Sequence, residues 1–566
     1  MSERLAGILL PAFSPRRDGD LGVGDTRAMK EWIDLCAENG VGFLQLLPIN
    51  ETGADDSPYN AISSVALEPV YLEMEAVPGL EESELSDARS RVEEVGEMGK
   101  GLERSATDVN YHLVRRVKRE LLELAWTRWS QAPPALHEEF ASFRAEESEW
   151  LDDYCVFRWL MDRAGGTEAW DLWPKEWHEV SGAREFYDKQ RDLDAQMVDS
   201  RLGYFAWVQW LCFSQWREVK KHADSKGMKL MGDIPIGVSR YSADVFFGRE
   251  DFDLDWCGGA PPETMFKHDR FIQKWGQNWG IPLYRWDKMA DEDFPWWRQR
   301  IEKLTDIFRI FRIDHILGFY RIYAFPWKPQ KNLEFLELTD EEAATRTGGE
   351  LPGWSPRPDD TDENKAANRA DGDLRLKVIL EAAGDAEVVG EDLGEVPDYV
   401  RPHLASLGIA GFRIPHWDSD HEGKVISGDE LPECSFATFA THDHQPIPAM
   451  WEELKKQSVD PELEEHERAD AAGWLRLMME FAGIEEAGPF SKEILWKLFD
   501  ALMASRSRYA AIMVNELFGM SERINQPGTV GPQNWTFRLS KTADEYREDG
   551  AWELLKGSIE RGQRSI

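Results

Sequence analysis

The chain of 566 residues is long enough to bury a large core, either as several domains or as one barrel with insertions. It carries 105 Asp and Glu residues against 66 Lys and Arg residues, a formal net charge of −39. This acidic balance argues against nucleic acid or an anionic membrane as a partner, because both bind positive surfaces. It suits a protein that acts on neutral or cationic ligands.

Cysteine usage and hydropathy favour a reduced, cytoplasmic location. The cysteines form no CxxC pair, which argues against a zinc site or a disulfide framework. The apolar patch in MSERLAGILLPAF is too short for the hydrophobic region of a signal sequence, and no stretch approaches 18 apolar residues, so no membrane span is predicted. The five cysteines are Cys36, Cys155, Cys212, Cys257 and Cys434.

Tryptophan is unusually abundant, with 25 residues in the chain. Many of these side chains will be core. However, flat aromatic faces also suit the apolar faces of sugar rings, and the indole N–H is a donor beside the ring. The tryptophan content therefore makes a carbohydrate ligand one candidate.

Eight short apolar runs, each ending in polar or glycine-rich residues, recur along the chain, and helical patterns separate most of them. DTRAMKEWIDLCAENG (25–40), for example, begins at an Asp cap and ends at Gly40. Strand and helix repeated eight times predict an α/β fold, a parallel (β/α)8 TIM barrel. The runs are 7–13, 41–49, 228–236, 308–315, 387–394, 411–418, 436–443 and 511–517.

Three segments are too long for simple crossovers between barrel strands. Residues 72–200 have helical periodicity and are expected to form a helical insertion. Residues 245–300 are aromatic and loop-like, and we expect them to form a lid over one barrel end. Residues 338–373 are charged and nearly devoid of large apolar side chains, as in an exposed excursion. The whole chain, 1–566, is thus predicted to be one catalytic barrel with large helical and loop insertions.

Carboxylates end three of the predicted strands: Asp314, Glu391 and Asp443. Chemistry in such barrels takes place at the C-terminal ends of the strands, so the fold would gather these acids at one mouth. Retaining glycoside chemistry needs a nucleophilic carboxylate and a protonated one, about 5–5.5 Å apart. A single acid at a strand end more often caps a helix or pairs with a lysine. Three at matching positions favour a functional interpretation.

The neighbours of these acids differ in a way that suits the two roles. Arg312 lies two residues before Asp314, on the same face of the strand, and its guanidinium favours an ionised Asp314. Glu391 follows the apolar residues VVG, a setting that raises the pKa of a carboxyl. A metal-dependent alternative also exists, because HDH (442–444) contains an HxH pair of the kind that binds zinc, although no other strand end supplies further histidines.

Eight motifs in chain order resemble the 4-α-glucanotransferases (amylomaltases, or disproportionating enzymes) of glycoside hydrolase family 77. The resemblance extends almost from end to end, and eight ordered motifs make it specific. The motifs are DSPY (56–59), GDIPI (232–236), SADV (242–245), GQNWG (276–280), RIDH (312–315), EDLG (391–394), THD (441–443) and RINQPGT…NW…R (523–538).

The resemblance implies a retaining transfer of α-1,4-glucan segments between maltose, malto-oligosaccharides, starch or glycogen, with no cofactor and no metal. By matching position, Asp314 would be the nucleophile, Glu391 the acid/base, and Asp443 the residue that stabilises the transition state. Substrate-binding roles would fall to Arg312, His315 and His442 in the donor subsite, Tyr59, Gln277 and Trp279 near the cleavage point, and Asn525 by the mouth.

The chain departs from the family pattern at three places near the predicted site. RIDHILGF replaces RIDHFRGF, so Leu317 stands where the pattern has an arginine. THDHQPIPAMW replaces THDNDT beside Asp443, and the 338–373 excursion is longer than is usual. The three carboxylates are intact, so these departures bear on acceptor preference rather than on the chemistry.

Two other functions fit the residues. An α-1,4-glucan hydrolase of the amylase type would use the same carboxylates with water as acceptor. A glucan-binding barrel without catalysis would use only the aromatic and polar side chains. The strand pattern alone does not separate transfer from hydrolysis, and only the resemblance favours transfer.

Overall fold

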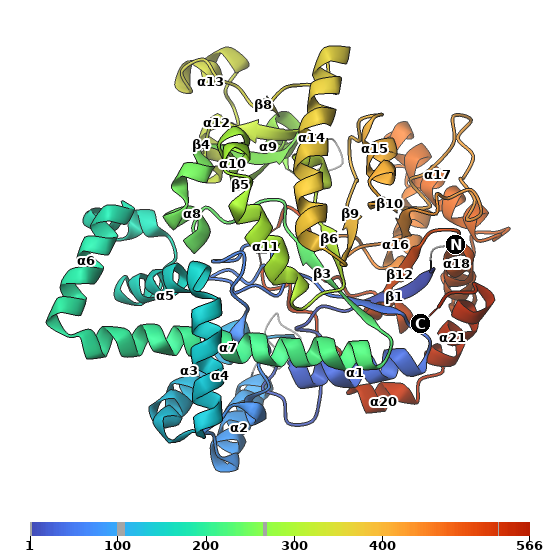
Figure 1. Cartoon of the computed structure of the whole chain (residues 1–566). Helices are drawn as coiled ribbons and strands as arrows, with labels where there is room; N and C mark the ends of the chain where they lie inside the picture. Colours follow the sequence, from blue (N-terminus) through green and yellow to red (C-terminus); the bar gives the residue numbers. More distant parts are fainter. Residues whose placement is uncertain (1–2, 99–107, 264–268, 530, 566) are drawn as a thin grey trace.

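The computed structural model describes residues 3–98, 108–263, 269–529 and 531–565. Its centre is a closed barrel of eight parallel strands in the order β1-β12-β11-β10-β9-β6-β3-β2 (Figure 1). The predicted (β/α)8 barrel is confirmed, and each barrel strand overlaps one predicted run. The strands are β1 (Leu5–Leu9), β2 (Phe43–Gln45), β3 (Lys229–Ile234), β6 (Ile310–Ile313), β9 (Glu387–Gly390), β10 (Ala410–Arg413), β11 (Ser435–Ala437) and β12 (Tyr509–Met513).

The interior of the barrel is a packed core to which every barrel strand contributes an apolar side chain. A large ring lies opposite a glycine, because a Cβ on Gly7 would lie 2.1 Å from the Phe43 ring. The Phe43 ring in turn packs edge-on against Tyr509 at 5.7 Å between centroids. Side chains thus fill the barrel, and a ligand must bind at its mouth.

Helices surround the barrel. The first, α1 (Thr26–Glu38), starts where the sequence predicts, because Asp25 accepts a hydrogen bond from the Ala28 N–H at 3.0 Å. It ends just before Gly40, which has a positive φ of 81°. The other long helices around the barrel are α7 (Ala195–Ser225), α11 (Pro295–Thr305), α14 (Asp362–Ala383), α16 (Ile447–Gln457), α17 (Glu465–Phe481), α18 (Lys492–Ala504) and α21 (Ala551–Arg561).

The segment 72–200 contains a group of helices between β2 and β3. Figure 1 shows them to one side of the barrel, with the long helix α7 leading back to β3. Aromatic rings bind this group together: Trp129 lies 5.7 Å from Trp207 and 5.5 Å from Trp210, between ring centroids. Many of the tryptophans are therefore core. The helices are α2 (Glu82–Met98), α3 (Tyr111–Arg128), α4 (Pro134–Glu146), α5 (Ser148–Arg163) and α6 (Val180–Leu193).

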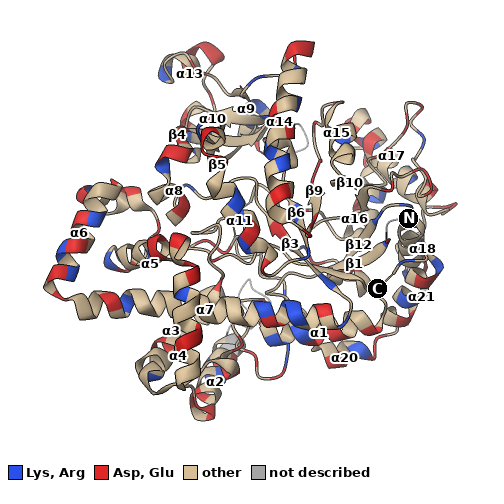
Figure 2. Cartoon of the chain, in the orientation of Figure 1, with Lys and Arg blue, Asp and Glu red and all other residues tan. Residues whose placement is uncertain are grey.

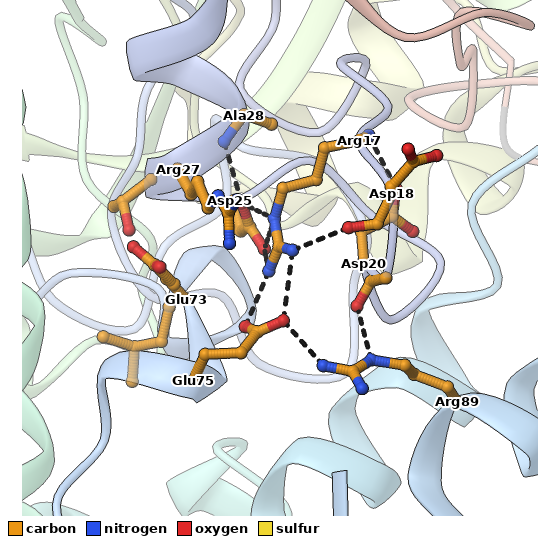
Figure 3. A network of polar contacts seen from close by, with 12 residues as sticks. Arg17, Asp18, Asp20, Asp25, Arg27, Ala28, Glu73, Glu75 and Arg89 are labelled. Carbon is orange, nitrogen blue, oxygen red and sulfur yellow. Dashed lines mark hydrogen bonds and ion pairs between the residues drawn. The ribbon is translucent and has the colours of Figure 1, made fainter. Parts of the chain in front are cut away.

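A buried ion network ties the loop after β1 to the start of this helical group (Figure 3). The Arg17 guanidinium donates to Asp25 at 2.7 Å and to Glu75 at 2.7 Å, and Arg89 of α2 donates to the other oxygen of Glu75 at 2.8 Å. Paired in this way, the charges can be buried without being orphaned. The network thus fixes the N-terminal end of α1 against the helical group.

A second sheet of four strands, ordered β5-β4-β7-β8, lies outside the barrel. Residues 245–300, expected to be loop-like, contain two of its strands and the helices α9 (Arg270–Trp275), α10 (Trp286–Asp291) and α11. Residues 338–373, expected to be a charged excursion, contain α13 (Asp340–Arg346), β8 and the first half of α14. The strands are β4 (Phe252–Ala260), β5 (Gln277–Tyr284), β7 (Ile322–Phe325) and β8 (Gly353–Ser355).

The surface charge is spread over the outer helices. Figure 2 shows Asp and Glu interspersed with Lys and Arg along α1, α6 and α20 (Ala543–Arg547), in the orientation of Figure 1. Across the described part of the chain, no helix has both the length and the apolar character needed to cross a membrane.

Candidate active site

Asp314 is the outer end of a buried ion network at the end of β6. The Arg312 guanidinium donates through Nη2 to Asp314 at 2.8 Å and through Nη1 to both oxygens of Asp233 at 2.8 and 2.7 Å. The side chains of Arg312 and Asp233 are 3% and 0% exposed, whereas that of Asp314 is 28% exposed. The predicted pairing of Arg312 with Asp314 is confirmed, and Asp314 is the member of the network that a ligand can reach.

Asp233 is a residue of this network that the sequence reasoning missed. It lies at the end of β3, and the register of β3 against β6 places it opposite Arg312. Its Oδ2 also accepts a hydrogen bond from the Tyr59 hydroxyl at 2.8 Å. Burial raises the pKa of Asp233, while the Arg312 charge opposes that rise. The available signal was the GDIPI motif, which places the acid Asp233 inside the apolar run 228–236.

Glu391 follows β9 and faces the loop after β6. Its Oε2 accepts a hydrogen bond from the His315 backbone N–H at 2.7 Å, which His315 can donate because its backbone is left-handed, with φ 47°. Burial raises the pKa of Glu391 to about 8; the Arg312 charge opposes the rise, and the charges of Asp314 and Asp443 add to it. The predicted rise in pKa is confirmed. Glu391 is thus the protonated carboxyl of the site at neutral pH.

Asp443 lies on the loop after β11 and has an opposite electrostatic environment. Enclosure in the protein alone would raise its pKa, but the neighbouring His442 charge and a hydrogen bond from Asn525 hold that pKa well below its usual range. Asn525 Nδ2 donates to Asp443 Oδ1 at 2.6 Å, and His442 Nε2 lies 3.3 Å from Oδ2. Asp443 is therefore ionised and held in place, with 39% of its side chain exposed.

Aromatic rings line both sides of these carboxylates. The Tyr59 ring stacks on His442 at 5.3 Å between centroids, and Trp535 packs against both rings. On the other side, the edge of the Trp279 ring meets His315 at 5.0 Å, and Trp279 Nε1 donates to Gln277 at 3.2 Å. Trp279 is 38% exposed, a large ring open to a ligand.

Contacts and chain neighbours connect all ten residues that the sequence singles out. Asp314 connects to Tyr59 through Arg312 and Asp233, and Tyr59 leads through His442 to Asp443 and Asn525. Glu391 connects through His315 to Trp279 and Gln277. The structure therefore gathers Tyr59, Gln277, Trp279, Arg312, Asp314, His315, Glu391, His442, Asp443 and Asn525 at one end of the barrel.

The two histidines of the HxH pair have separate partners, and His442 Nε2 lies 3.3 Å from Asp443 Oδ2. His444 Nδ1 accepts one hydrogen bond from the Thr441 N–H at 3.0 Å and forms a second with the Thr441 hydroxyl at 2.8 Å. Within the described residues, no group of three or more His, Cys, Asp or Glu side chains is placed to hold a metal ion.

Replacement of Asp233 by Asn is expected to destabilise the protein strongly. The change leaves Arg312 Nη1 buried without its carboxylate, and breaking a buried ion pair costs about 3–5 kcal/mol. Urea denaturation would measure the free energy of unfolding. Asp306→Asn is the control, because Asp306 also pairs with an arginine, Arg217 at 2.7 Å, but is 31% exposed, and exposed pairs contribute about 0–1 kcal/mol. Equal losses in the two variants would contradict this account of Asp233.

A (β/α)8 barrel that gathers acidic side chains with opposed pKa shifts at the ends of its strands defines a barrel enzyme with carboxylate chemistry. The comparison with known families identifies the family of enzymes to which the chain belongs. The family model described as 4-alpha-glucanotransferase, glycoside hydrolase family 77, matches residues 10–543, and the chain belongs to this family.

Relatives match over nearly the whole length. The 4-alpha-glucanotransferase of Chlamydia caviae is 28% identical over 551 residues, which cover 95% of this chain and 91% of that protein. The 4-alpha-glucanotransferase of Thermus thermophilus is also 28% identical, with 95% of both chains covered. Among solved structures, the amylomaltase of Streptococcus agalactiae in complex with acarbose superposes with a TM-score of 0.75 at 23% identity, covering 100% of both chains. That similarity supports the fold.

Proposed function

We propose that the chain is a retaining 4-α-glucanotransferase, which moves α-1,4-glucan segments from a donor to the 4-hydroxyl of an acceptor sugar through a covalent glycosyl-enzyme. The observation that carries the proposal is the pair of carboxyls in unlike surroundings beside one loop. Asp314 is held by the Arg312 guanidinium, and Glu391 has a pKa of about 8. A nucleophile and a general acid must differ in this way.

In the first step, Glu391 gives its proton to the glycosidic oxygen while Asp314 attacks the anomeric carbon. The bond between carbon and oxygen breaks, the leaving glucan departs with a new hydroxyl group, and an ester joins Asp314 to the donor segment. The Arg312 hydrogen bond fixes the attacking carboxylate, which matters because a misplaced nucleophile loses the benefit of orientation.

In the second step, the ionised Glu391 takes the proton from the 4-hydroxyl of the acceptor. The acceptor oxygen attacks the anomeric carbon and releases Asp314. Each step inverts the configuration at the anomeric carbon, so the product retains that of the donor. Ionised Asp443, held by Asn525 and His442, is placed to bind sugar hydroxyls as the ring distorts.

The exposed Trp279 and the sheet behind it are candidates for the acceptor side of the cleft. Trp279 lies on β5, in the 245–300 segment, and presents a ring on which a sugar can stack. Transfer to sugar rather than to water needs a dry cleft, and we assign the role of lid to this segment. Donors and acceptors would be maltose, malto-oligosaccharides, starch or glycogen. A cytoplasmic location fits the five free cysteines, four of which are buried.

Incubation with maltotriose tests transfer directly. We expect glucose together with oligosaccharides longer than maltotriose, while the total number of reducing ends stays constant. Shortening alone, with a rise in reducing ends, would indicate the amylase-type hydrolase. Binding of maltotriose without any product would indicate a glucan-binding barrel, and loss of activity on adding a chelator would indicate a metal hydrolase.

A further inference from the structure

Arg321 lies just beyond the loop that follows the predicted nucleophile. It is the seventh residue after Asp314, and its backbone N–H donates to the Leu317 carbonyl at 3.0 Å, which closes the short helix η7 (Ile316–Phe319). Leu317 is the position where the family pattern has an arginine, so Arg321 is the next arginine after Arg312 in this chain. Arg321 therefore supplies a positive charge next to the loop that carries Asp314 and His315, where Leu317 supplies none.

The guanidinium of Arg321 is held on several sides. Its centre lies 3.4 Å from the centroid of the Trp354 ring, and its Nε donates to Asp359. Asp359 also accepts from the Tyr399 hydroxyl at 3.1 Å and from Asn368 at 2.9 Å, so it is a firm anchor. The Arg321 side chain is 5% exposed, and a flat cation between a ring and a carboxylate has little freedom.

The residues that hold Arg321 come from the charged segment 338–373. Its strand β8 pairs with β7, which begins at the residue after Arg321, and Trp354 lies opposite Tyr323 in that pairing. The same sheet continues through β4 to β5, which carries Gln277 and Trp279. Figure 1 shows α13 and β8 beside β4 and β5 on this side of the barrel. The segment is thus part of one sheet with the predicted glucan-binding residues.

Arg321 also reaches the loops that carry the reacting groups. Its Nη2 lies 3.8 Å from Glu395, four residues after Glu391. Burial lowers the pKa of His315 to about 4; the Asp314 charge opposes that fall, and the Arg321 charge adds to it. Arg321 Nη1 is buried and has no hydrogen-bond acceptor among the described residues.

We infer that Arg321, held by Trp354 and Asp359, is a positioning residue for the loop of Asp314 and His315, and that the 338–373 segment acts on the α-glucan donor subsite through it. The inference rests on the proposed function. The Trp279 ring packs against one side of His315. The charge of Arg321 also acts on His315. Because Arg321 closes η7 and its side chain is anchored by Trp354 and Asp359, the segment fixes the end of the loop that carries His315, whose ring would bind a sugar hydroxyl.

Two pairs of variants test this inference by transfer from maltotriose. Arg321→Gln is expected to lower kcat/KM by about 10- to 100-fold, the loss that follows small misplacement of reacting groups. Arg321→Lys keeps the charge but loses the planar guanidinium, so we expect a kcat/KM between those of Arg321→Gln and the wild type. Trp354→Phe keeps a ring under the guanidinium and should stay near the wild type, whereas Trp354→Leu should approach Arg321→Gln.

The pH profile separates positioning from a merely structural role. Without the Arg321 charge, the pKa of His315 rises, so the acidic limb of kcat/KM should move to higher pH in Arg321→Gln and stay in place in Arg321→Lys. Glu341→Gln, an exposed change in α13 away from Arg321, is the control and should match the wild type. If Arg321→Gln fails to fold, the Trp354 pair still decides the matter.

The two possible failures are distinguishable. A wild-type protein that makes no longer oligosaccharides would overturn the proposed function. A wild type that transfers, with Trp354→Leu equal to Trp354→Phe and the acidic limb unmoved, would overturn the role of Arg321 alone.

Discussion

Replacement of Asp314 by Asn is expected to abolish transfer from maltotriose while the protein stays folded. An amide does not form the glycosyl ester, and removal of a catalytic nucleophile costs about 10⁴- to 10⁶-fold in kcat. Arg312 keeps its two hydrogen bonds to Asp233, so the buried part of the network survives the change. Release of glucose over hours, at high enzyme concentration, would measure the residual rate.

The matched control for this variant lies at the opposite end of the same strand. Arg309 precedes β6 and donates to Asp224 at 2.8 Å, an arginine–aspartate pair like that of Arg312 with Asp314. Asp224→Asn should leave kcat within about twofold of the wild type, because chemistry takes place only at the C-terminal end of the barrel. Transfer by Asp314→Asn at a tenth of the wild-type rate or more would remove Asp314 from the role of nucleophile.

Replacement of Glu391 by Gln is expected to lower kcat by about 10²- to 10⁴-fold, the usual contribution of general acid–base catalysis. The loss should depend on the leaving group. A maltosyl fluoride needs no proton to release fluoride, so Glu391→Gln should still form the glycosyl-enzyme quickly from this donor. In the wild type, activity on maltotriose should fall as the pH rises above about 8, where Glu391 loses its proton. Equal losses on both donors would contradict an acid role.

The raised pKa of Glu391 should also make the free energy of unfolding depend on pH. That pKa is raised from 4.5 to about 8, so between these values the folded protein keeps a proton that the unfolded chain has released. The free energy of unfolding must then decrease as the pH rises through this window. The wild type should therefore lose more stability between pH 5 and pH 8 than Glu391→Gln does.

The barrel and its carboxylates were predictable because both depend on local pattern. Apolar runs that alternate with helical periods specify strands, and parallel strands bring their C-terminal ends to one mouth. Asp314, Glu391 and Asp443 each end such a run, so their convergence follows from the fold class. Asp233 lies inside a run, and its partnership with Arg312 depends on the register of β3 against β6, which no single strand reveals.

The second sheet was not predictable for a different reason. Glycine and proline are depleted from strands, yet Gly258 and Gly259 lie within β4 and Pro282 within β5. Close approach of the two backbones explains Gly259, because a Cβ there would lie 1.9 Å from the Gln277 carbonyl oxygen. Pairing between distant segments, rather than local propensity, makes these strands. The anchoring of Arg321 by Trp354 depends on the same long-range pairing.

The left-handed backbone of His315 is a further feature that pattern does not reveal. A positive φ is uncommon outside glycine, and here it turns the N–H of His315 toward Glu391. The RIDH motif identifies His315 as a site residue. Only the geometry shows that its backbone contacts Glu391 while its ring contacts Trp279.

Trapping the glycosyl-enzyme tests the central claim most directly. Glu391→Gln, mixed with a maltosyl fluoride and no acceptor sugar, should accumulate the ester because the second step lacks its base. Mass spectrometry of the digested protein should then find one maltosyl group on the peptide that contains Asp314. A label on another residue, or products of inverted anomeric configuration without any label, would contradict the account.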